Sequence, residues 1–87
     1  MVSRTVKVEN AVGLHARPAT FFIQKANSYV SSILIECDGG KVNAKSLLGV
    51  LSLGIVKDSE ITLTATGADE NEAVEGLAAL IEAGLSE

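Results

Sequence analysis

The chain has 87 residues, of which 47% are apolar and 21% are charged, and its formal net charge is −4. This length predicts a single domain, residues 1–87, with one core. The negative balance argues against nucleic acid as a direct partner, because phosphate backbones bind clustered Lys and Arg. The single cysteine, Cys37, excludes an internal disulfide and a multi-cysteine zinc site.

The N-terminal stretch "MVSRTVKVEN" lacks the apolar segment of a signal peptide, and no apolar run approaches the length of a membrane span. No linker, internal repeat or low-complexity segment interrupts the sequence. We therefore expect a soluble, cytoplasmic protein of one domain, without membrane insertion.

The first part of the chain predicts a strand, a loop and a helix. Valines that alternate with polar residues favour the strand, at Val2, Val6 and Val8. The loop that follows contains Gly13, whose backbone can adopt angles closed to other residues. From Ala16 onward, apolar residues recur at helical spacing: Ala19, Phe22, Ile23 and Ala26. Pro18 suits the first turn of this helix, where its missing N–H is no loss.

The middle of the chain predicts strands. In "SSILIECDGGKVNA", apolar residues alternate up to Cys37, and "DGG" supplies a tight turn into a second strand at 41–44. The later segment "EITLTAT" alternates equally well, with apolar residues on one face and threonines on the other. A face of threonines predicts a sheet with one solvated side, which is typical of antiparallel or mixed sheets.

The last element is a predicted helix that begins at "GADENEA". Asp69 can cap it, and Glu72 three residues later would complete a capping box. An apolar stripe follows, and Gly84 is a plausible stop; the stripe consists of Ala73, Val74, Leu77, Leu80 and Ile81. With a short helix after Ser46, this order of elements predicts a two-layer α/β sandwich with its helices on one face of the sheet.

His15 lies immediately before the helix that Pro18 helps to start, with Arg17 two residues further on. A helix N-terminus has unpaired N–H groups and a partial positive charge, so it favours anions. Arg17 adds a planar set of donors matched to phosphate oxygens. This combination predicts a histidine that accepts a phosphoryl group and passes it on. The alternative, a loop histidine beside a solvated arginine, stays open on these residues alone. No metal site is expected, since Cys37 is the sole other strong soft ligand and is predicted on a strand.

Ser46 stands before a predicted short helix that runs from Leu47 to Leu53. Apolar residues surround most of that helix, and a surface helix buries only one stripe. Some leucines should therefore stay exposed as an interaction patch. The alternatives are a wholly buried segment or a strand. Ser46 is typical of an unmodified N-cap, and a phosphate on it would add roughly −1.5 to −2 charges beside the patch.

Three segments, "GLHARPA", "KSLLGVLSLG" and "GADENEA", resemble the corresponding segments of HPr, the histidine-containing phosphocarrier family of the bacterial sugar phosphotransferase system. The resemblance runs over essentially the whole chain, and the first two segments are specific in combination. It implies an α/β two-layer open-faced sandwich, in which a four-stranded antiparallel sheet of order 1-4-2-3 carries three helices on one face. The element pattern alone leaves a ferredoxin-like arrangement open.

The resemblance also implies a function, that of a phosphocarrier without independent turnover and without a cofactor. Enzyme I would phosphorylate His15, and the phosphoryl group would pass to the enzyme IIA domains of sugar permeases. The implied phosphate-binding residues are Ala16, Arg17 and Pro18. The implied docking face is formed by Thr20, Phe22, Leu47, Leu48 and Leu51.

Ser46 matches the serine that HPr kinase/phosphorylase modifies in low-GC Gram-positive bacteria, where the serine-phosphorylated form is a corepressor for the catabolite control protein. The pair "KS" before an aliphatic helix is typical of that branch. Leu48 and Leu51 depart from it, since methionines are usual there. Gln24 and Asn27 lack the lysine charges of some members, which weakens electrostatic steering toward acidic partners.

A regulatory binding module is the second hypothesis, in which Ser46 phosphorylation matters and His15 has no part in the sugar relay. A regulatory paralogue known in bacilli lacks the active histidine, so the presence of His15 argues against a purely regulatory role. A small hydrolase with His15 as base is disfavoured, because no nucleophile stands beside a base and so small a domain gives little shelter from water. Docking to several partners in turn favours a monomer.

Overall fold

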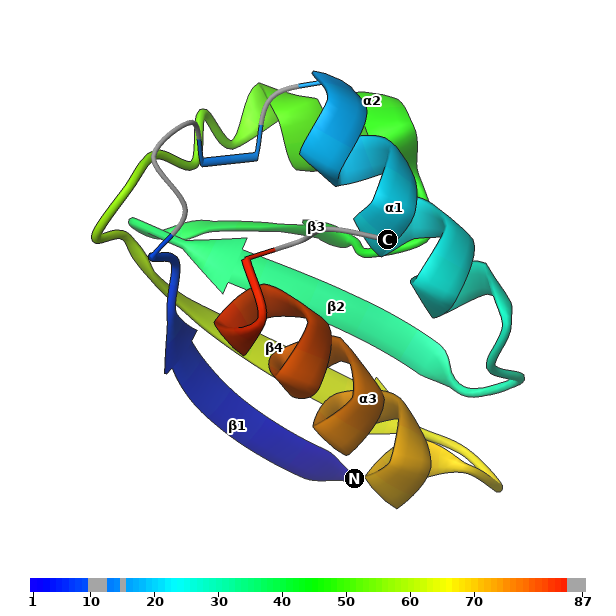
Figure 1. Ribbon diagram of the computed structural model, residues 1–87. Helices are drawn as coiled ribbons and strands as arrows, with labels where there is room; N and C mark the ends of the chain where they lie inside the picture. The colour runs from blue at the N-terminus through cyan, green and yellow to red at the C-terminus, as the bar shows by residue number, and fades with distance from the viewer. Residues whose placement is uncertain (10–12, 15, 85–87) are drawn as a thin grey trace.

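The computed structural model describes residues 1–9, 13–14 and 16–84. Four strands form one antiparallel sheet: β1 (Val2–Lys7), β2 (Ser32–Cys37), β3 (Gly40–Asn43) and β4 (Glu60–Thr66). Three helices cover one face of the sheet (Figure 1): α1 (Ala16–Asn27), α2 (Leu47–Ser52) and α3 (Glu70–Glu82). The strand order is β1-β4-β2-β3. The predicted open-faced sandwich is confirmed, and this order excludes the ferredoxin-like alternative.

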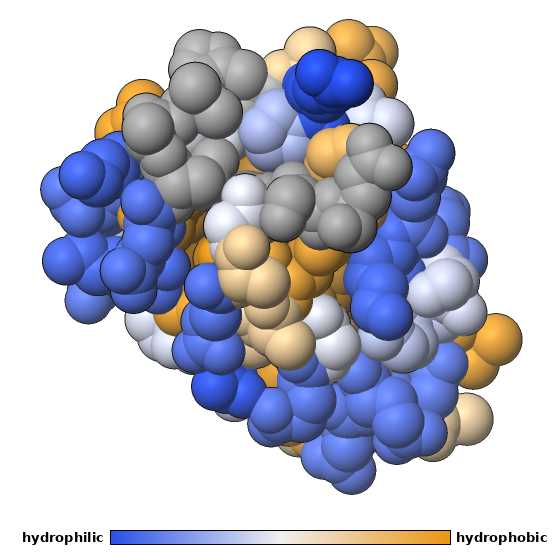
Figure 2. Space-filling view, viewed as in Figure 1, coloured by the Kyte–Doolittle hydropathy of each residue, from blue (hydrophilic) through white to orange (hydrophobic). Residues whose placement is uncertain are grey.

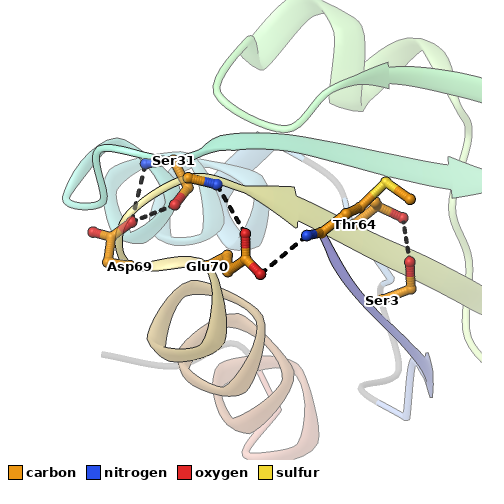
Figure 3. A network of polar contacts seen from close by, with 7 residues as sticks. Ser3, Ser31, Thr64, Asp69 and Glu70 are labelled. Atoms are coloured by element: carbon orange, nitrogen blue, oxygen red, sulfur yellow. Dashed lines mark hydrogen bonds and ion pairs between the residues drawn. The ribbon is translucent and has the colours of Figure 1, made fainter.

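Strand β4 shows why the sheet has one covered and one open face. Every second residue is buried in the core: Ile61, Leu63 and Ala65. The intervening Thr62 and Thr64 lie on the open face, where their hydroxyls share hydrogen bonds with hydroxyls of β1. Thr62 bonds Thr5 (Oγ1–Oγ1 3.0 Å) and Thr64 bonds Ser3 (Oγ1–Oγ 2.9 Å; Figure 3). The predicted alternation is confirmed, and these cross-strand pairs stabilise the solvated side of the sheet.

The strands β2 and β3 form the predicted hairpin. Asp38 and Gly39 make the turn with φ of +50° and +84°, and a type I′ turn requires positive φ at both central residues. Cys37 pairs with Gly40 across the turn. Strand β3 therefore begins at Gly40, one residue before the predicted start, and it ends at Asn43.

The hydrophobic core lies between the sheet and the helices. Helix α1 contributes one stripe at helical spacing, formed by Ala19, Phe22 and Ala26. Helix α3 contributes a second stripe, formed by Ala73, Val74, Leu77, Ala78 and Ile81. Because α1 buries only this stripe, its opposite side and its first turn remain on the surface.

The start of α3 differs from the predicted capping box. The helix begins at Glu70, and the Asp69 side chain makes no capping bond. Instead, the Asp69 carboxylate accepts hydrogen bonds from the N–H groups of Val30 and Ser31 (3.0 Å each) and from the Ser31 hydroxyl (2.5 Å; Figure 3). Glu70, rather than Glu72, reaches back, accepting a bond of 3.1 Å from the N–H of Gly67. Three bonds to a carboxylate outweigh the single bond that a cap would make.

The end of α3 is as predicted. The last helical residue is Glu82, Ala83 is the C-cap, and Gly84 follows with φ of +89°. Glycine adopts that left-handed conformation without the cost that a Cβ would impose, so it ends a helix well.

Candidate functional site

The predicted phosphoacceptor, His15, lies outside the described residues, and both of its neighbours are described. Leu14 is buried, and its N–H donates to the Ile55 carbonyl (3.0 Å). Ala16 is the first residue of α1. The chain on either side of position 15 is therefore fixed, by the core on one side and by a helix on the other.

The first turn of α1 carries the other predicted phosphate-binding residues. Ala16 and Arg17 are exposed, and Pro18 is half-buried within the first turn, as predicted. Among the residues that the structure describes, none forms an ion pair with Arg17. Arg17 is the second residue of α1, so it belongs to a helix N-terminus, where the helix dipole and the positive charge of the side chain both favour an anion. Thr20 is exposed, and its hydroxyl donates to the Ala16 carbonyl (2.8 Å).

Helix α2 presents apolar side chains to the solvent. Leu48 is 82% exposed and Leu47 is 39% exposed, whereas Val50 is buried. Leu51 is half-buried against the core. In Figure 2 apolar atoms gather at the upper edge of the molecule, over the position of α2 in Figure 1. The expected patch of partly exposed leucines is confirmed, and a wholly buried segment or a strand is excluded.

Phe22 was expected to line the docking face, and this expectation is wrong. Its side chain has no exposed surface and belongs to the buried stripe of α1, with Ala19 and Ala26 on either side. Residues at this spacing share one face of a helix, so Phe22 cannot turn outward without leaving the core. Thr20, on another side of the helix, keeps its surface position.

Val56 is an exposed apolar residue that the sequence analysis did not single out. Its side chain is 56% exposed, and it follows Ile55, which is buried. A Cβ placed on Gly13 would lie 2.6 Å from the Val56 Cα, so the backbone of this segment passes directly beside Gly13. Val56 therefore lies on the surface next to the loop that carries position 15. In the sequence only two apolar residues, Ile55 and Val56, follow Gly54, and a run of two is too short to indicate a strand.

Ser46 is the N-cap of α2, as predicted. Its φ and ψ are −105° and 115°, and its hydroxyl accepts a bond of 3.1 Å from the N–H of Gly49. The preceding residue, Lys45, ties this turn to the end of α1. Its ammonium donates to the Tyr29 carbonyl (2.7 Å), and its own carbonyl accepts from the Asn27 side-chain amide (3.3 Å). Ser46 is half-buried at a fixed position, and its phosphorylation stays a prediction.

Shifted pKa values within the described residues occur at the start of α3, for Asp69 and Glu70, and in the β2–β3 hairpin, for Cys37. The Ser31 hydroxyl, followed by backbone N–H groups, lowers the pKa of Asp69. The Gly67 N–H and then the N-terminal amine lower the pKa of Glu70. Burial raises the pKa of the Cys37 thiol, which disfavours the thiolate needed for nucleophilic or metal chemistry.

Two further findings limit the chemistry of the described part of the chain. No group of three or more His, Cys, Asp or Glu side chains within it could hold a metal ion. None of its helices is long and apolar enough to cross a membrane. The exposed start of α1, the exposed leucines of α2 and Val56 make up the candidate site.

Comparison with known proteins gives matches over the whole chain. Residues 2–83 match the family described as "PTS HPr component phosphorylation site". The HPr-like protein Crh of Halalkalibacterium halodurans is 54% identical over 82 residues, which cover 94% of this chain and 98% of the relative. The crystal structure of HPr-C-His from Thermoanaerobacter tengcongensis has a TM-score of 0.96 at 45% identity, and the match covers 100% of this chain and 98% of that one. Crh of Bacillus subtilis, solved as an intertwined, domain-swapped dimer, has a TM-score of 0.77 at 46% identity over the full length of both chains.

These relatives include both HPr and Crh proteins at similar identity, so similarity alone does not separate the two types. Dimers of both Crh and HPr are among the solved relatives, and the monomeric state expected from the sequence is therefore not supported by the comparisons.

Proposed function

The chain belongs to the HPr family, and from that premise we propose that it is a phosphocarrier that holds a phosphoryl group on His15. It accepts the group from phosphorylated Enzyme I and delivers it to enzyme IIA domains of sugar permeases, in the cytoplasm, without turnover of its own. The observation that carries this proposal is the run from His15 to Pro18 at the start of α1, with Arg17 exposed. The family match, described as a phosphorylation site, supports it.

The chemistry assigned to these residues is a direct transfer. A neutral ring nitrogen of His15 attacks phosphorus, the new N–P bond forms, and the bond between phosphorus and the donor breaks. Negative charge on the phosphoryl oxygens is then stabilised by Arg17 and by the unpaired N–H groups of Ala16 and Arg17 at the helix start. Pro18 fixes where that helix begins without removing an N–H that the helix needs.

The proposed docking surface surrounds this helix start. Leu47, Leu48 and Leu51 on α2 supply its apolar part, Thr20 supplies a polar edge on α1, and Val56 extends it beside the loop that carries His15. Exposed leucines in one cluster are typical of protein interaction sites. A shallow, exposed site also suits a group that must pass between proteins.

Regulation is proposed at Ser46, by a kinase of the HPr kinase/phosphorylase type, with a catabolite control protein as partner of the modified form. This assigns the chain to the low-GC Gram-positive type of the family. The N-cap position of Ser46, directly before the exposed Leu47 and Leu48, supports the proposal. A phosphate there would place about −1.5 to −2 charges at the edge of the apolar docking surface.

Incubation with phosphoenolpyruvate and Enzyme I tests the carrier function. The intact protein should gain the mass of one phosphate, and the label should be lost in acid because N–P bonds are acid-labile. A His15→Ala variant should gain none, and Arg17→Lys should be labelled more slowly because it keeps the charge but loses the planar donor set. A His15→Ala variant that is labelled like the wild type would disprove the assigned site.

A regulatory module is the second candidate function, and the similarity to Crh favours it. In that case phosphorylation at Ser46 is the relevant event, and His15 does not serve sugar uptake. A reconstituted sugar phosphorylation assay separates the two candidates. A carrier restores sugar phosphate formation when added to Enzyme I and a permease, and a regulatory module does not.

A further inference from the structure

The loop between β1 and α1 is held at both ends by one short segment, residues 55–59. At the near end, the Val8 N–H donates to the Ser59 carbonyl (2.8 Å) and the Asp58 N–H donates to the Val8 carbonyl (2.7 Å). At the far end, the Leu14 N–H donates to the Ile55 carbonyl (3.0 Å). The 55–59 segment, which we call the floor, is therefore bonded to the chain at Val8 and at Leu14, on either side of residues 10–12.

This floor is itself fixed. Ile55 is buried in the core. The Val56 N–H donates to the Ser59 hydroxyl (3.1 Å), and the Ser59 N–H returns a bond to the Val56 carbonyl (3.1 Å). These two bonds close a turn, and Ile55 anchors that turn in the core. The backbone of the 55–59 segment is therefore held in one conformation.

Gly13 is a described residue of this loop whose backbone passes directly beside the floor. It is buried, has φ of +62°, and a Cβ on it would lie 2.6 Å from the Val56 Cα and 3.0 Å from the Val56 carbonyl carbon. The obstacles are backbone atoms, which cannot rotate away as a side chain would. Any side chain at position 13 must therefore lift the loop away from the floor or deform the floor.

We infer that Gly13 and the backbone of Ile55 and Val56 form a clamp that holds the chain directly before the phosphoacceptor, and that phosphoryl transfer to His15 depends on this clamp. This inference rests on the proposed function, since it concerns the same phosphoacceptor. Gly13 and Ser59 are positioning residues: they act through the backbone and touch neither donor nor phosphoryl group. The clamp also joins the acceptor loop to Val56, whose side chain lies in the proposed docking surface.

Gly54 provides a matched control for Gly13. Its φ is +61°, so alanine suffers the same backbone strain at both positions, but a Cβ on Gly54 would meet nothing within 4 Å. Phosphorylation is measured with Enzyme I and with phosphoramidate, a small donor that needs no docking surface. With phosphoramidate the histidine nitrogen gains the phosphoryl group and ammonia leaves.

Gly13→Ala should be phosphorylated about 10- to 100-fold more slowly with both donors, because small displacements of a reacting group cost that much. With Enzyme I the loss should fall on kcat, with KM little changed. Gly54→Ala should match the wild type with phosphoramidate. Ser59→Ala, which removes one bond from the floor, should show a smaller loss with both donors. Ser28→Ala, which removes a hydroxyl bond to the Lys25 carbonyl at the other end of α1, should show none.

Equal phosphoramidate rates for folded Gly13→Ala and Gly54→Ala would overturn the inference, as would a Gly13→Ala loss confined to Enzyme I. If Gly13→Ala does not fold, the serine pair decides the question, and equal rates for Ser59→Ala and Ser28→Ala count against the clamp. Failure of the proposed function looks different: the wild-type protein itself then takes up no phosphate on His15 from either donor.

Discussion

Gly76, in the middle of α3, has no room for a methyl group because Tyr29 occupies the space. A Cβ on Gly76 would collide with the Tyr29 hydroxyl and lie 3.1 Å from the ring carbon Cζ. Tyr29 follows the end of α1 and packs partly buried against the core, with the Lys25 ammonium 5.7 Å from the centre of its ring. Helix α3 therefore has a glycine at an interior position, where glycine is less favourable than alanine, and this leaves room for Tyr29.

Two opposing free energies decide the outcome of Gly76→Ala. Alanine at an interior helix position favours folding by roughly 0.5–1 kcal/mol over glycine. Forcing extra volume into an occupied site costs typically about 1–3 kcal/mol. The clash therefore wins, and we expect Gly76→Ala to lower the free energy of unfolding by about 1 kcal/mol.

The same substitution should change sign once Tyr29 is removed. In a Tyr29→Ala background only the flexible Lys25 side chain remains beside the new methyl group, with its Cε at 3.3 Å, and it can move away. Gly76→Ala should then raise the free energy of unfolding by about 0.5–1 kcal/mol. The coupling between the two sites is then about 2 kcal/mol. Tyr29→Phe removes only the hydroxyl and leaves Cζ at 3.1 Å, so the effect in that background should be intermediate.

Urea unfolding of the six proteins, followed by circular dichroism, measures these differences. A double-mutant cycle cancels the loss of the Lys25 contact, because that loss occurs in both Tyr29→Ala proteins. A Gly76→Ala substitution that stabilises the wild-type protein would show that Tyr29 does not block the methyl group, and so would two substitutions whose effects add within about 0.5 kcal/mol.

Three further predictions concern stability. The pKa of Asp69 is lowered, chiefly by the Ser31 hydroxyl, so its contribution is complete above the unfolded pKa of about 3.9 and is lost as the pH falls through the lower folded pKa. Urea unfolding at falling pH should show this loss in the wild type, and Asp69→Asn should flatten the profile. Ser46→Ala removes the cap of α2 and should cost about 1 kcal/mol in urea unfolding, whereas Ser46→Asp should retain most of it. Leu48→Ala should change stability by less than about 0.5 kcal/mol while slowing transfer from Enzyme I, and Leu51→Ala should cost more stability because that side chain packs against the core.

Local sequence patterns predicted the fold wherever neighbours along the chain decide a residue's environment. The alternation of β4 and the turn at Asp38 and Gly39 are local features, and both are confirmed. The strand order is not local, because alternation indicates which face a residue occupies and not which strand lies beside it. That order came from the family resemblance. The capping box failed for a similar reason, since Asp69 bonds Ser31, 38 residues away, in preference to its own helix.

The same distinction, between features set by neighbours in the sequence and features set by distant contacts, applies to the candidate site. Helical spacing placed Phe22 in the buried stripe of α1, and that local inference was better than the docking role implied by the resemblance. The exposed leucines of α2 could be predicted because a six-residue helix with apolar residues on most sides cannot bury them all. Val56 could not be predicted, because its position beside Gly13 depends on a contact between segments distant in sequence.

The structure also bears on how a charge at Ser46 would affect phosphorylation of His15. Helix α1 begins at Ala16 and ends at Asn27, whose side chain bonds the carbonyl of Lys45, the residue before Ser46. At 1.5 Å per residue the two ends of the helix are about 16 Å apart. Exposed charges separated by more than a Debye length, about 8 Å at physiological ionic strength, are largely screened.

Direct repulsion between the two phosphates is therefore weak, whereas Leu47 and Leu48 in the docking surface follow Ser46 immediately. A charge at Ser46 should act on docking and leave the acceptor itself unchanged. We expect Ser46→Asp to slow transfer from Enzyme I through a higher KM, and to leave the rate with phosphoramidate within about twofold of the wild type. Ser46→Asn, of similar size and without the charge, is the control. A Ser46→Asp rate that falls equally with both donors would show that the charge reaches His15, and the docking explanation would then be wrong.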